Sequence, residues 1–384
     1  MAGRGRSRAT SSGLHCLRWN AAKTRLQGVP VRVAGKLAVA GRSAAPQRPG
    51  GIDAAAVRRR LLAWYTRARR DLPWRGSRDP YLVWVSEVML QQTQVERVRE
   101  FFLRFTRRFP TVAALAAARE DEVLRLWEGL GYYRRARQLH AAARLVVADH
   151  GGEFPRTLEG LRGLPGVGRY TAGAIASIAL DVPAPIVEAN SRRVIARLAG
   201  HDRPVGGAGD EPIWEIAAAL VSRTAPGSFN QALMDLGALV CTPDRPLCGR
   251  CPLQALCAAQ CSGRVAVIPV MVAARPARKI RERALVTRHG DRVLVERRGP
   301  GAWWEGLWDF PRVAPAEAKT AEARRLGVVT YTVTHHKVTC GVLERRVRRV
   351  TKPGPGQRWV AIGRLGSLAM TAPGRRIAAL LARD

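Results

Sequence analysis

The middle of this 384-residue chain carries Leu164-Pro165-Gly166-Val167-Gly168-Arg169-Tyr170-Thr171-Ala172. The proline and the two glycines predict that one helix ends here and that a tight turn follows. The small residues from Ala172 to Leu180 predict a second helix, on which another element packs closely. The start of such a helix presents backbone N–H groups that bind phosphate oxygens without reading bases. The alternative is a plain connection between two helices.

Helical periodicity extends on both sides of this segment, from Ile52 to about Ala259, and no strand is predicted there. Apolar residues recur at i, i+3, i+4 and i+7, as on one face of a helix. The stretches concerned are Val57–Tyr65, Leu82–Val95, Val123–Leu130, Val194–Leu198 and Ile213–Val221. This part of the chain is therefore predicted to be mostly helical.

Five of the seven cysteines fall within residues 241–261, and four have the spacing Cys241-x6-Cys248-x2-Cys251-x5-Cys257. A local cluster of thiols indicates a metal site in a reducing compartment rather than a disulfide framework. Four thiolates can hold one tetrahedral zinc or one iron–sulfur cluster. Zinc sites more often pair two CxxC motifs across a longer loop, whereas this segment has one CxxC pair with longer arms; both kinds of site stay open here. Four cysteine ligands leave no open coordination position, which indicates a structural or redox role.

The chain is strongly basic, with 64 Lys and Arg against 30 Asp and Glu and a formal net charge of +34. Such an excess favours a polyanionic partner, nucleic acid before an anionic lipid surface. A GC-rich genome that enriches arginine is the alternative source of part of this charge. No apolar run approaches the ~20 residues of a membrane span, so no membrane partner is expected.

Composition also divides the chain. Residues 1–51 hold ten Lys and Arg and no acid, which predicts a basic, unfolded arm; a transit peptide is the alternative. Residues 263–281 are predicted to form an extended linker. An α+β domain over residues 282–384 follows, with predicted strands at Ala284–Arg288, Arg292–Arg297, Val328–Val338 and Val342–Val350 and a helix at Arg375–Arg383.

Two glutamates have positions that suit acid–base chemistry. Glu87 lies in the otherwise apolar stretch Leu82–Leu90, and if it faces inward, desolvation favours its protonated form. Glu188 precedes Ala189-Asn190-Ser191, where a helix is expected to start, and a helix N-terminus favours an ionised carboxylate. The alternatives are a solvent-facing acid and an ordinary helix-start acid. One protonated and one ionised acid is the pair that cleaves a glycosidic bond.

Residues 52–262 resemble the MutY adenine DNA glycosylase family of the helix–hairpin–helix superfamily. The resemblance is carried by Leu72-Pro73-Trp74-Arg75, Ser86–Val95, Trp127–Tyr133 and the segment Leu164–Ala172. It implies a mostly α, two-lobed fold followed by a Nudix-like domain. Residues 52–80 and 183–262 would form the iron–sulfur lobe, and residues 81–182 a six-helix lobe with the hairpin. One 4Fe–4S cluster is implied on Cys241, Cys248, Cys251 and Cys257.

The resemblance also implies roles for single residues. Glu87 protonates the adenine, assisted by Glu188, Asn190 and Tyr170. The residues implied in DNA or base binding are Trp74, Arg75, Gln92, Thr93, Leu130, Tyr132, Gly166 and Gly168. Tyr170 occupies the position at which related lyases carry a Schiff-base lysine, so a monofunctional glycosylase is expected. Glu188-Ala189 departs from the family's Asp-Gly, and we expect the backbone to compensate.

The C-terminal domain resembles the Nudix-like domain that the family uses to recognise 8-oxoguanine. Gly306–Pro311 carries the resemblance, and Thr334 and His335 match the loop that contacts the damaged base. Val333 replaces an aromatic residue of that loop. The acid cluster of Nudix hydrolases is missing from residues 316–319 and 322–325, so binding without hydrolysis is expected.

Together these features predict a monomeric, intracellular enzyme, cytoplasmic or nucleoid-associated, that acts on double-stranded DNA. It would release adenine paired with 8-oxoguanine or guanine during base-excision repair. Two alternatives stay open: an endonuclease III-like glycosylase and lyase acting on oxidised pyrimidines, and a non-catalytic lesion-binding protein.

Overall fold

The computed structural model describes residues 51–272, 276–314 and 323–382. It divides into two compact units, one containing residues up to Asp71 and Gly173–Val272, the other Leu72–Ala172 and Ala273–Asp384. Residues 1–50 of the predicted basic arm lie outside the described residues, and so do residues 316–319 and 322, which belong to the segments predicted to lack the Nudix acid cluster. Within the described ranges, no helix has the length and apolar character needed to span a membrane.

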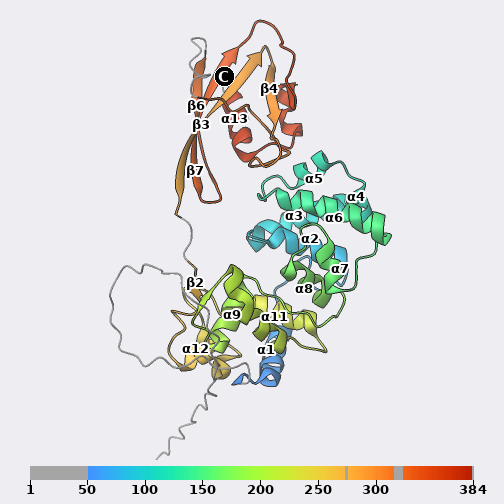
Figure 1. Cartoon of the computed structure of the whole chain (residues 1–384), viewed down its shortest axis with the longest axis vertical. Helices are drawn as coiled ribbons and strands as arrows, with labels where there is room; N and C mark the ends of the chain where they lie inside the picture. Colours follow the sequence, from blue (N-terminus) through green and yellow to red (C-terminus); the bar gives the residue numbers. More distant parts are fainter. Residues whose placement is uncertain (1–50, 273–275, 315–322, 383–384) are drawn as a thin grey trace, which may run out of the picture. The chain divides into compact units, whose positions relative to one another are not determined.

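The first unit is built on α11 (Pro226–Leu239), which packs against α1 (Ala54–Ala68) and α9 (Ala189–Ala199) (Figure 1). A Cβ on Gly237 would lie 2.6 Å from Cβ of Asn190, so only glycine permits this approach of α11 to α9. The remaining elements are α10 (Glu211–Leu220), α12 (Ala258–Cys261), β1 (Pro204–Val205) and β2 (Val270–Met271). The short parallel pairing of β1 with β2 was not predicted.

Helix α8 (Arg169–Ile178) begins in the second unit and continues into the first. Its small residues are closely covered, as predicted. The Pro185 carbonyl lies so near Gly173 that a side chain there would clash, and a Cβ on Gly227 would lie 2.7 Å from the Ser177 carbonyl oxygen.

The helical part of the second unit begins with α2 (Pro80–Leu90), whose first turn is capped. Asp79 accepts the Tyr81 N–H at 2.8 Å, and Pro80 occupies the first helical position, where its missing N–H costs nothing. The predicted helix Leu82–Val95 is shorter than expected. It ends at Leu90, because Gln91 leaves the helical conformation with ψ of 114°, and Gln92 then adopts a left-handed conformation with φ of 56°.

The other helices of this part are α3 (Val95–Arg108), α4 (Val112–Ala116), α5 (Glu120–Leu126), α6 (Arg134–His150) and α7 (Leu158–Gly163). The predicted turn after α7 is confirmed, because α7 ends at Gly163 and α8 begins at Arg169. Gly166 has φ of 76°, and a Cβ there would lie 2.7 Å from Cβ of Gln138. Glycine is therefore required both by the backbone conformation and by the lack of space for a side chain.

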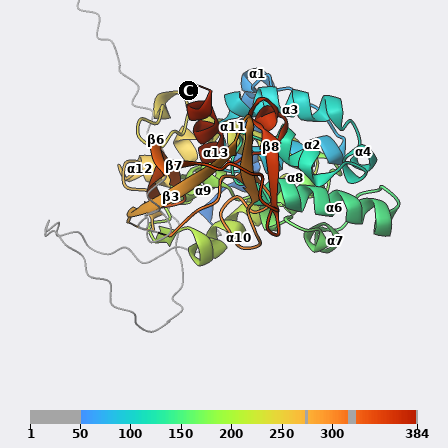
Figure 2. The same ribbon diagram turned by 90° about the horizontal axis from the view of Figure 1, so that it is seen from above.

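The C-terminal part of the second unit is a mixed sheet of order β5-β4-β3-β7-β6, with β8 also paired to β4. The strands are β3 (Arg278–His289), β4 (Arg292–Arg297), β5 (Trp308–Asp309), β6 (Arg324–Val333), β7 (His336–Arg346) and β8 (Gln357–Ala361). Among the described strands of this sheet, β3 and β7 pair in parallel and the other strand pairs are antiparallel. Helix α13 (Ala372–Leu381) lies beside this sheet in both views (Figures 1 and 2), and its Ile377 and Leu381 join the sheet's core.

Three predictions for this domain are corrected. The single strand predicted over Val328–Val338 is two strands, β6 and β7, joined at Thr334 and His335. The predicted linker is too long, because Arg278–Arg281 already pairs with β7. The last helix starts earlier than expected, since the Thr371 hydroxyl caps it by accepting the Gly374 N–H at 2.8 Å.

Candidate active site

Glu87 faces the interior of the second unit. Its side chain lies on α2 among apolar neighbours and is 5% exposed. The Tyr170 hydroxyl, from the first turn of α8, donates a hydrogen bond to the Glu87 carboxylate. The inward orientation predicted for Glu87 is therefore confirmed, and the solvent-facing alternative is wrong. A buried carboxyl group held by a phenol has the environment that a general acid needs.

Trp74 and Arg75 lie in a turn at the start of the second unit. Trp74 is buried and meets Phe102 edge-on, with ring centroids 5.4 Å apart. The Arg75 N–H donates to the Leu72 carbonyl at 2.8 Å, which closes the turn. Trp74 is therefore a fixed aromatic wall; its contact with adenine stays a prediction.

Two exposed turns carry the residues predicted to enter the duplex. Gln92 and Tyr132 are both exposed, and both have left-handed backbones, with φ of 56° and 48°. Such conformations cost non-glycine residues about 1–3 kcal/mol and gather at functional sites. Leu130, predicted to act with them, is instead buried at 6% exposure, so it packs inward rather than presenting a side chain to the surface.

Arg135, which the sequence reasoning missed, joins these two turns. Its buried guanidinium donates hydrogen bonds to five acceptors. They are the carbonyls of Val88 (2.8 Å), Met89 (3.2 Å), Gln91 and Gly131 (3.2 Å), and the Thr93 hydroxyl (3.3 Å). The Arg135 side chain therefore fixes Gln91 and Thr93 on either side of Gln92, and also Gly131, which precedes Tyr132.

The aromatic surroundings of Arg135 complete this arrangement. Its guanidinium lies 5.5 Å from the Trp127 ring centroid and 5.4 Å from that of Tyr132. Burial lowers the pKa of Arg135 to about 10, so it remains cationic at neutral pH. The sequence held a signal: Arg135, Leu139, Ala142 and Val146 share one helical face, which is the buried face of α6.

Glu188 caps the start of α9, as predicted. Its carboxylate accepts the N–H groups of Asn190 at 2.7 Å and Ser191 at 2.8 Å. The Ser191 hydroxyl in return accepts the Glu188 N–H at 2.9 Å, which completes a capping box. The added methylene of glutamate is thus accommodated by a standard helix cap.

The protonation of Glu188 is governed by opposing effects. Burial raises the pKa of Glu188, while the two backbone hydrogen bonds and the charges of Arg193 and Arg192 act to lower it. The net direction is upward. The ionised state expected from the helix start stays a prediction. The structure adds the opposing effect of burial, which depends on packing that the local sequence does not reveal.

Arg193 connects this helix start with the cysteine segment. Its guanidinium donates to the Asn190 side-chain oxygen at 2.9 Å, to the Gly237 carbonyl at 2.7 Å and to the Cys241 carbonyl at 2.7 Å. Asn190 is thereby held in place by a network that reaches the first of the four cysteines.

The four cysteines of the predicted site are neighbours in space. Burial, and then repulsion from the thiolates of Cys241, Cys257 and Cys248, raises the pKa of Cys251 to about 12. Arg197 donates to the Cys241 sulfur at 3.4 Å. No three His, Cys, Asp or Glu side chains of the described ranges form a group that would hold a single metal ion.

The hairpin between β6 and β7 presents Thr334 and His335. Thr334 is exposed and left-handed, with φ of 51°, and its hydroxyl lies 3.4 Å from His335 Nδ1 and 3.2 Å from His336 Nδ1. Trp303, which was not predicted, lies with its ring centroid 5.1 Å from that of His336. The pair Trp303-Trp304 was the signal in the sequence, and it places an aromatic face beside a hairpin whose Val333 is aliphatic.

Comparisons with known proteins agree with this geometry. Residues 85–208 match the HhH-GPD superfamily of base excision DNA repair proteins, and residues 283–380 match the NUDIX domain. The chain is 50% identical to the rat adenine DNA glycosylase over 231 residues, covering 56% of this chain and 45% of that protein. It is 38% identical to the mouse adenine DNA glycosylase, covering 80% of this chain and 74% of that protein. It is 37% identical to the human adenine DNA glycosylase, covering 80% of this chain and 70% of that protein.

The matches to the mouse and human proteins extend over most of this chain and of each of those proteins. The two matched domains correspond to the helical and α+β parts described above. The buried Glu87 and the hairpin at Gly166 fall within residues 85–208, and most of the C-terminal sheet falls within residues 283–380. This chain therefore belongs to the adenine DNA glycosylase family, base-excision repair enzymes with a helix–hairpin–helix body and a C-terminal Nudix-like domain.

Proposed function

We propose that this glycosylase removes adenine that is paired with 8-oxoguanine or guanine in duplex DNA, as a monomer and without cutting the strand. The observation that carries the proposal is the buried Glu87 carboxyl group bonded to Tyr170. A tyrosine at position 170 supplies no amine nucleophile, so no Schiff base forms there with the sugar. This feature disfavours the lyase alternative.

In the proposed reaction, Glu87 gives its proton to the adenine ring, and the bond between the base and C1′ breaks with its electron pair leaving on the base. The sugar cation that forms is stabilised by the ionised Glu188 carboxylate, near which Asn190 is fixed by Arg193. Water then adds to C1′ and loses a proton to Glu87. A positively charged sugar intermediate is the common feature of glycoside hydrolysis.

The duplex would be bound by elements around this chemistry. The hairpin at Gly166 and Gly168 binds phosphate, and Gln92, Thr93 and Tyr132 enter the base stack. Extrusion of the adenine costs a few kcal/mol and is easiest at a mispair. On the C-terminal domain, Thr334 and His335 would contact 8-oxoguanine, with Trp303 supplying the aromatic surface that Val333 lacks.

We further propose that Cys241, Cys248, Cys251 and Cys257 hold one 4Fe–4S cluster. When bound, such a cluster supplies a redox-active cross-link within the segment. A cubane takes each thiolate on a different iron, so it needs neighbouring thiols that do not converge on one point. Arg197, which donates to the Cys241 sulfur, would offset part of the negative charge that four thiolate ligands bring.

Cys251→Ser is expected to lower the iron content of the purified protein and its melting temperature, since a cluster ligand is lost. Iron and sulfide assays with thermal unfolding measure both. Cys340→Ala is the matched control, because Cys340 is buried in the core of the C-terminal sheet and should leave iron content unchanged. Equal iron in the two variants would contradict the assigned ligands.

The rate of adenine release is expected to fall on acidification at a higher pH than an ordinary glutamate would dictate. The reason is that burial raises the pKa of Glu188 and the proposed role needs its ionised form, which is lost below that pKa. Single-turnover rates measured against pH test this. Glu188→Gln should be slow and should lack this acidic limb; an unchanged profile would exclude Glu188 as its source.

The function is tested by incubating the purified full chain with duplexes carrying adenine opposite 8-oxoguanine, guanine, cytosine or thymine. Free adenine and strand breaks are both assayed. We expect most adenine from the 8-oxoguanine duplex, then from guanine, with breaks only after base treatment. Breaks without base would favour the lyase, and tight binding without adenine release would favour the lesion-binding protein.

A further inference from the structure

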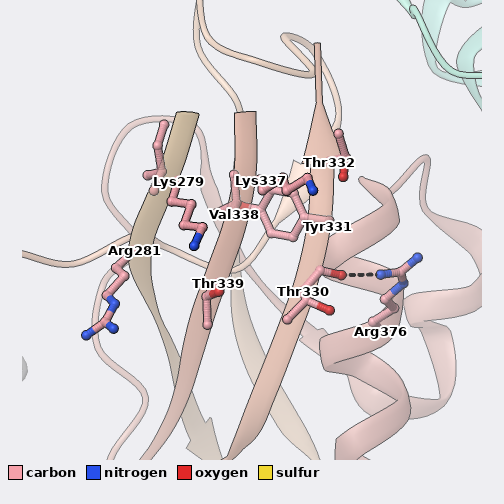
Figure 3. Close-up of a pocket in the computed structure, with 10 residues that line it drawn as sticks. Lys279, Arg281, Thr330, Tyr331, Thr332, Lys337, Val338, Thr339 and Arg376 are labelled. Atoms are coloured by element: carbon pink, nitrogen blue, oxygen red, sulfur yellow. Dashed lines mark hydrogen bonds between the residues drawn. The ribbon is translucent and has the colours of Figure 1, made fainter. Parts of the chain in front are cut away.

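One face of the C-terminal sheet is cationic and hydroxyl-rich at its β6–β7 hairpin end. The residues on it come from three neighbouring strands: Lys279 and Arg281 from β3, Lys337 and Thr339 from β7, and Thr330 and Thr332 from β6 (Figure 3). All six are exposed, and they alternate with inward-facing residues such as Val338 and Cys340. A groove of about 580 Å³ runs among them. We refer to these six residues as the basic face.

The strand register arranges the basic face in two rows. Lys279 pairs with Lys337, which pairs in turn with Thr332. In the next row, Arg281 pairs with Thr339, which pairs with Thr330. Neighbouring strands lie about 4.8 Å apart, so Lys279 and Lys337 bring two like charges side by side, an arrangement that destabilises a sheet.

This charge is not neutralised within the described ranges, where no carboxylate pairs with Lys279, Arg281 or Lys337. The nearby Glu282 accepts from Arg312 at 3.1 Å and from the Tyr331 hydroxyl at 2.6 Å. Because Lys279 and Lys337 repel each other and have no carboxylate partner among the described residues, an anion from outside the chain would reduce their repulsion.

A further cationic side chain, Arg376, lies at the edge of this sheet. Arg376 of α13 donates to the Thr330 carbonyl on the edge strand β6, as the dashed line in Figure 3 marks. Thr332 and Lys337 stand one residue away from the ends of the hairpin that carries Thr334 and His335. The basic face therefore begins where the proposed contact with the damaged base ends.

We propose that the basic face binds the phosphate backbone of the DNA duplex beside the lesion. Its three strands span about 10 Å, a distance over which one DNA strand carries about three phosphates at 3.4 Å of rise each. Lysine, arginine and threonine are regular phosphate donors that position a protein without reading sequence. The proposal rests on the proposed function only in that the hairpin faces the DNA.

The test is the salt dependence of duplex binding by Lys279→Ala/Lys337→Ala in the full chain. Each lost phosphate contact removes about 0.9 from the slope of log K against log salt, so the slope should fall by about 2. The ratio of the variant's Kd to the wild-type Kd should therefore fall about tenfold as the salt concentration rises from about 50 to about 200 mM. Lesion-containing and undamaged duplexes should lose affinity equally, because phosphates carry no sequence information.

Lys352→Ala/Arg364→Ala is the matched control. It removes the same charge from exposed positions of the same domain outside the basic face, and should leave the slope nearly unchanged. An unchanged slope in Lys279→Ala/Lys337→Ala overturns the proposal and would leave an acidic protein as the partner to seek. An equal loss in the control overturns it too, since general charge would explain the effect.

A third variant separates this proposal from the proposed function. Thr334→Ala/His335→Ala should reduce the preference for 8-oxoguanine over guanine while keeping the salt slope of the wild type. If the wild type released no adenine from any duplex, the proposed function would fail, while the salt slope would still decide the role of the basic face.

Discussion

Glu87→Gln is expected to lower the rate of adenine release by about 10²–10⁴-fold while leaving duplex affinity within a fewfold of wild type. A general acid contributes about this factor, and an amide cannot deliver the proton. Glutamine has nearly the shape of glutamate, so the packing around a side chain that is 5% exposed should persist. Single-turnover adenine release and a direct binding assay on the same preparation measure the two quantities.

Tyr170→Phe is the companion variant. It removes the hydroxyl that donates to the Glu87 carboxylate but keeps the aromatic ring. We expect a smaller loss of rate than in Glu87→Gln, because the acid is still present but no longer held. If Glu87→Gln lost duplex binding in proportion to its loss of rate, Glu87 would be a structural residue and the proposed chemistry would need another acid.

Arg135→Met is expected to destabilise the protein by about 3 kcal/mol and to weaken duplex binding strongly. Removing the guanidinium leaves several buried carbonyls without their donor, at about 1–3 kcal/mol each before relaxation. It also releases the two turns in which Gln92 and Tyr132 hold left-handed backbones. Urea unfolding and duplex binding are the measurements.

Two variants make this prediction specific. Arg144→Met lies on the exposed face of the same helix and should change neither stability nor binding much. Arg135→Lys keeps the charge, but lysine cannot reach acceptors on both turns at once. Its stability and its duplex affinity should therefore lie between those of the wild type and of Arg135→Met. Binding at the wild-type level in Arg135→Met would show that the two turns hold their conformations independently of this arginine.

Much of the fold follows from interactions between residues close in sequence. Periodicity places the helices, Pro165 and Gly166 place the turn between α7 and α8, and the residues after Glu188 place the start of α9. The cysteine spacing identifies a metal site for the same reason, because all four ligands come from 17 consecutive residues. The resemblance to a family then supplied the chemistry that spacing alone leaves open.

Tertiary structure decided what depends on distant residues and on burial. Tyr170 reaches Glu87 across 83 positions, and Arg135 reaches Gln91 across 44. The local pattern places Glu188 at a helix start but cannot show its desolvation, which raises its pKa. The pairing of Lys279 with Lys337 likewise exists only once β3 and β7 are in register. Periodicity and capping act over one or two turns of chain, whereas desolvation and side-chain partnership are set by which distant surfaces the folded chain brings into contact.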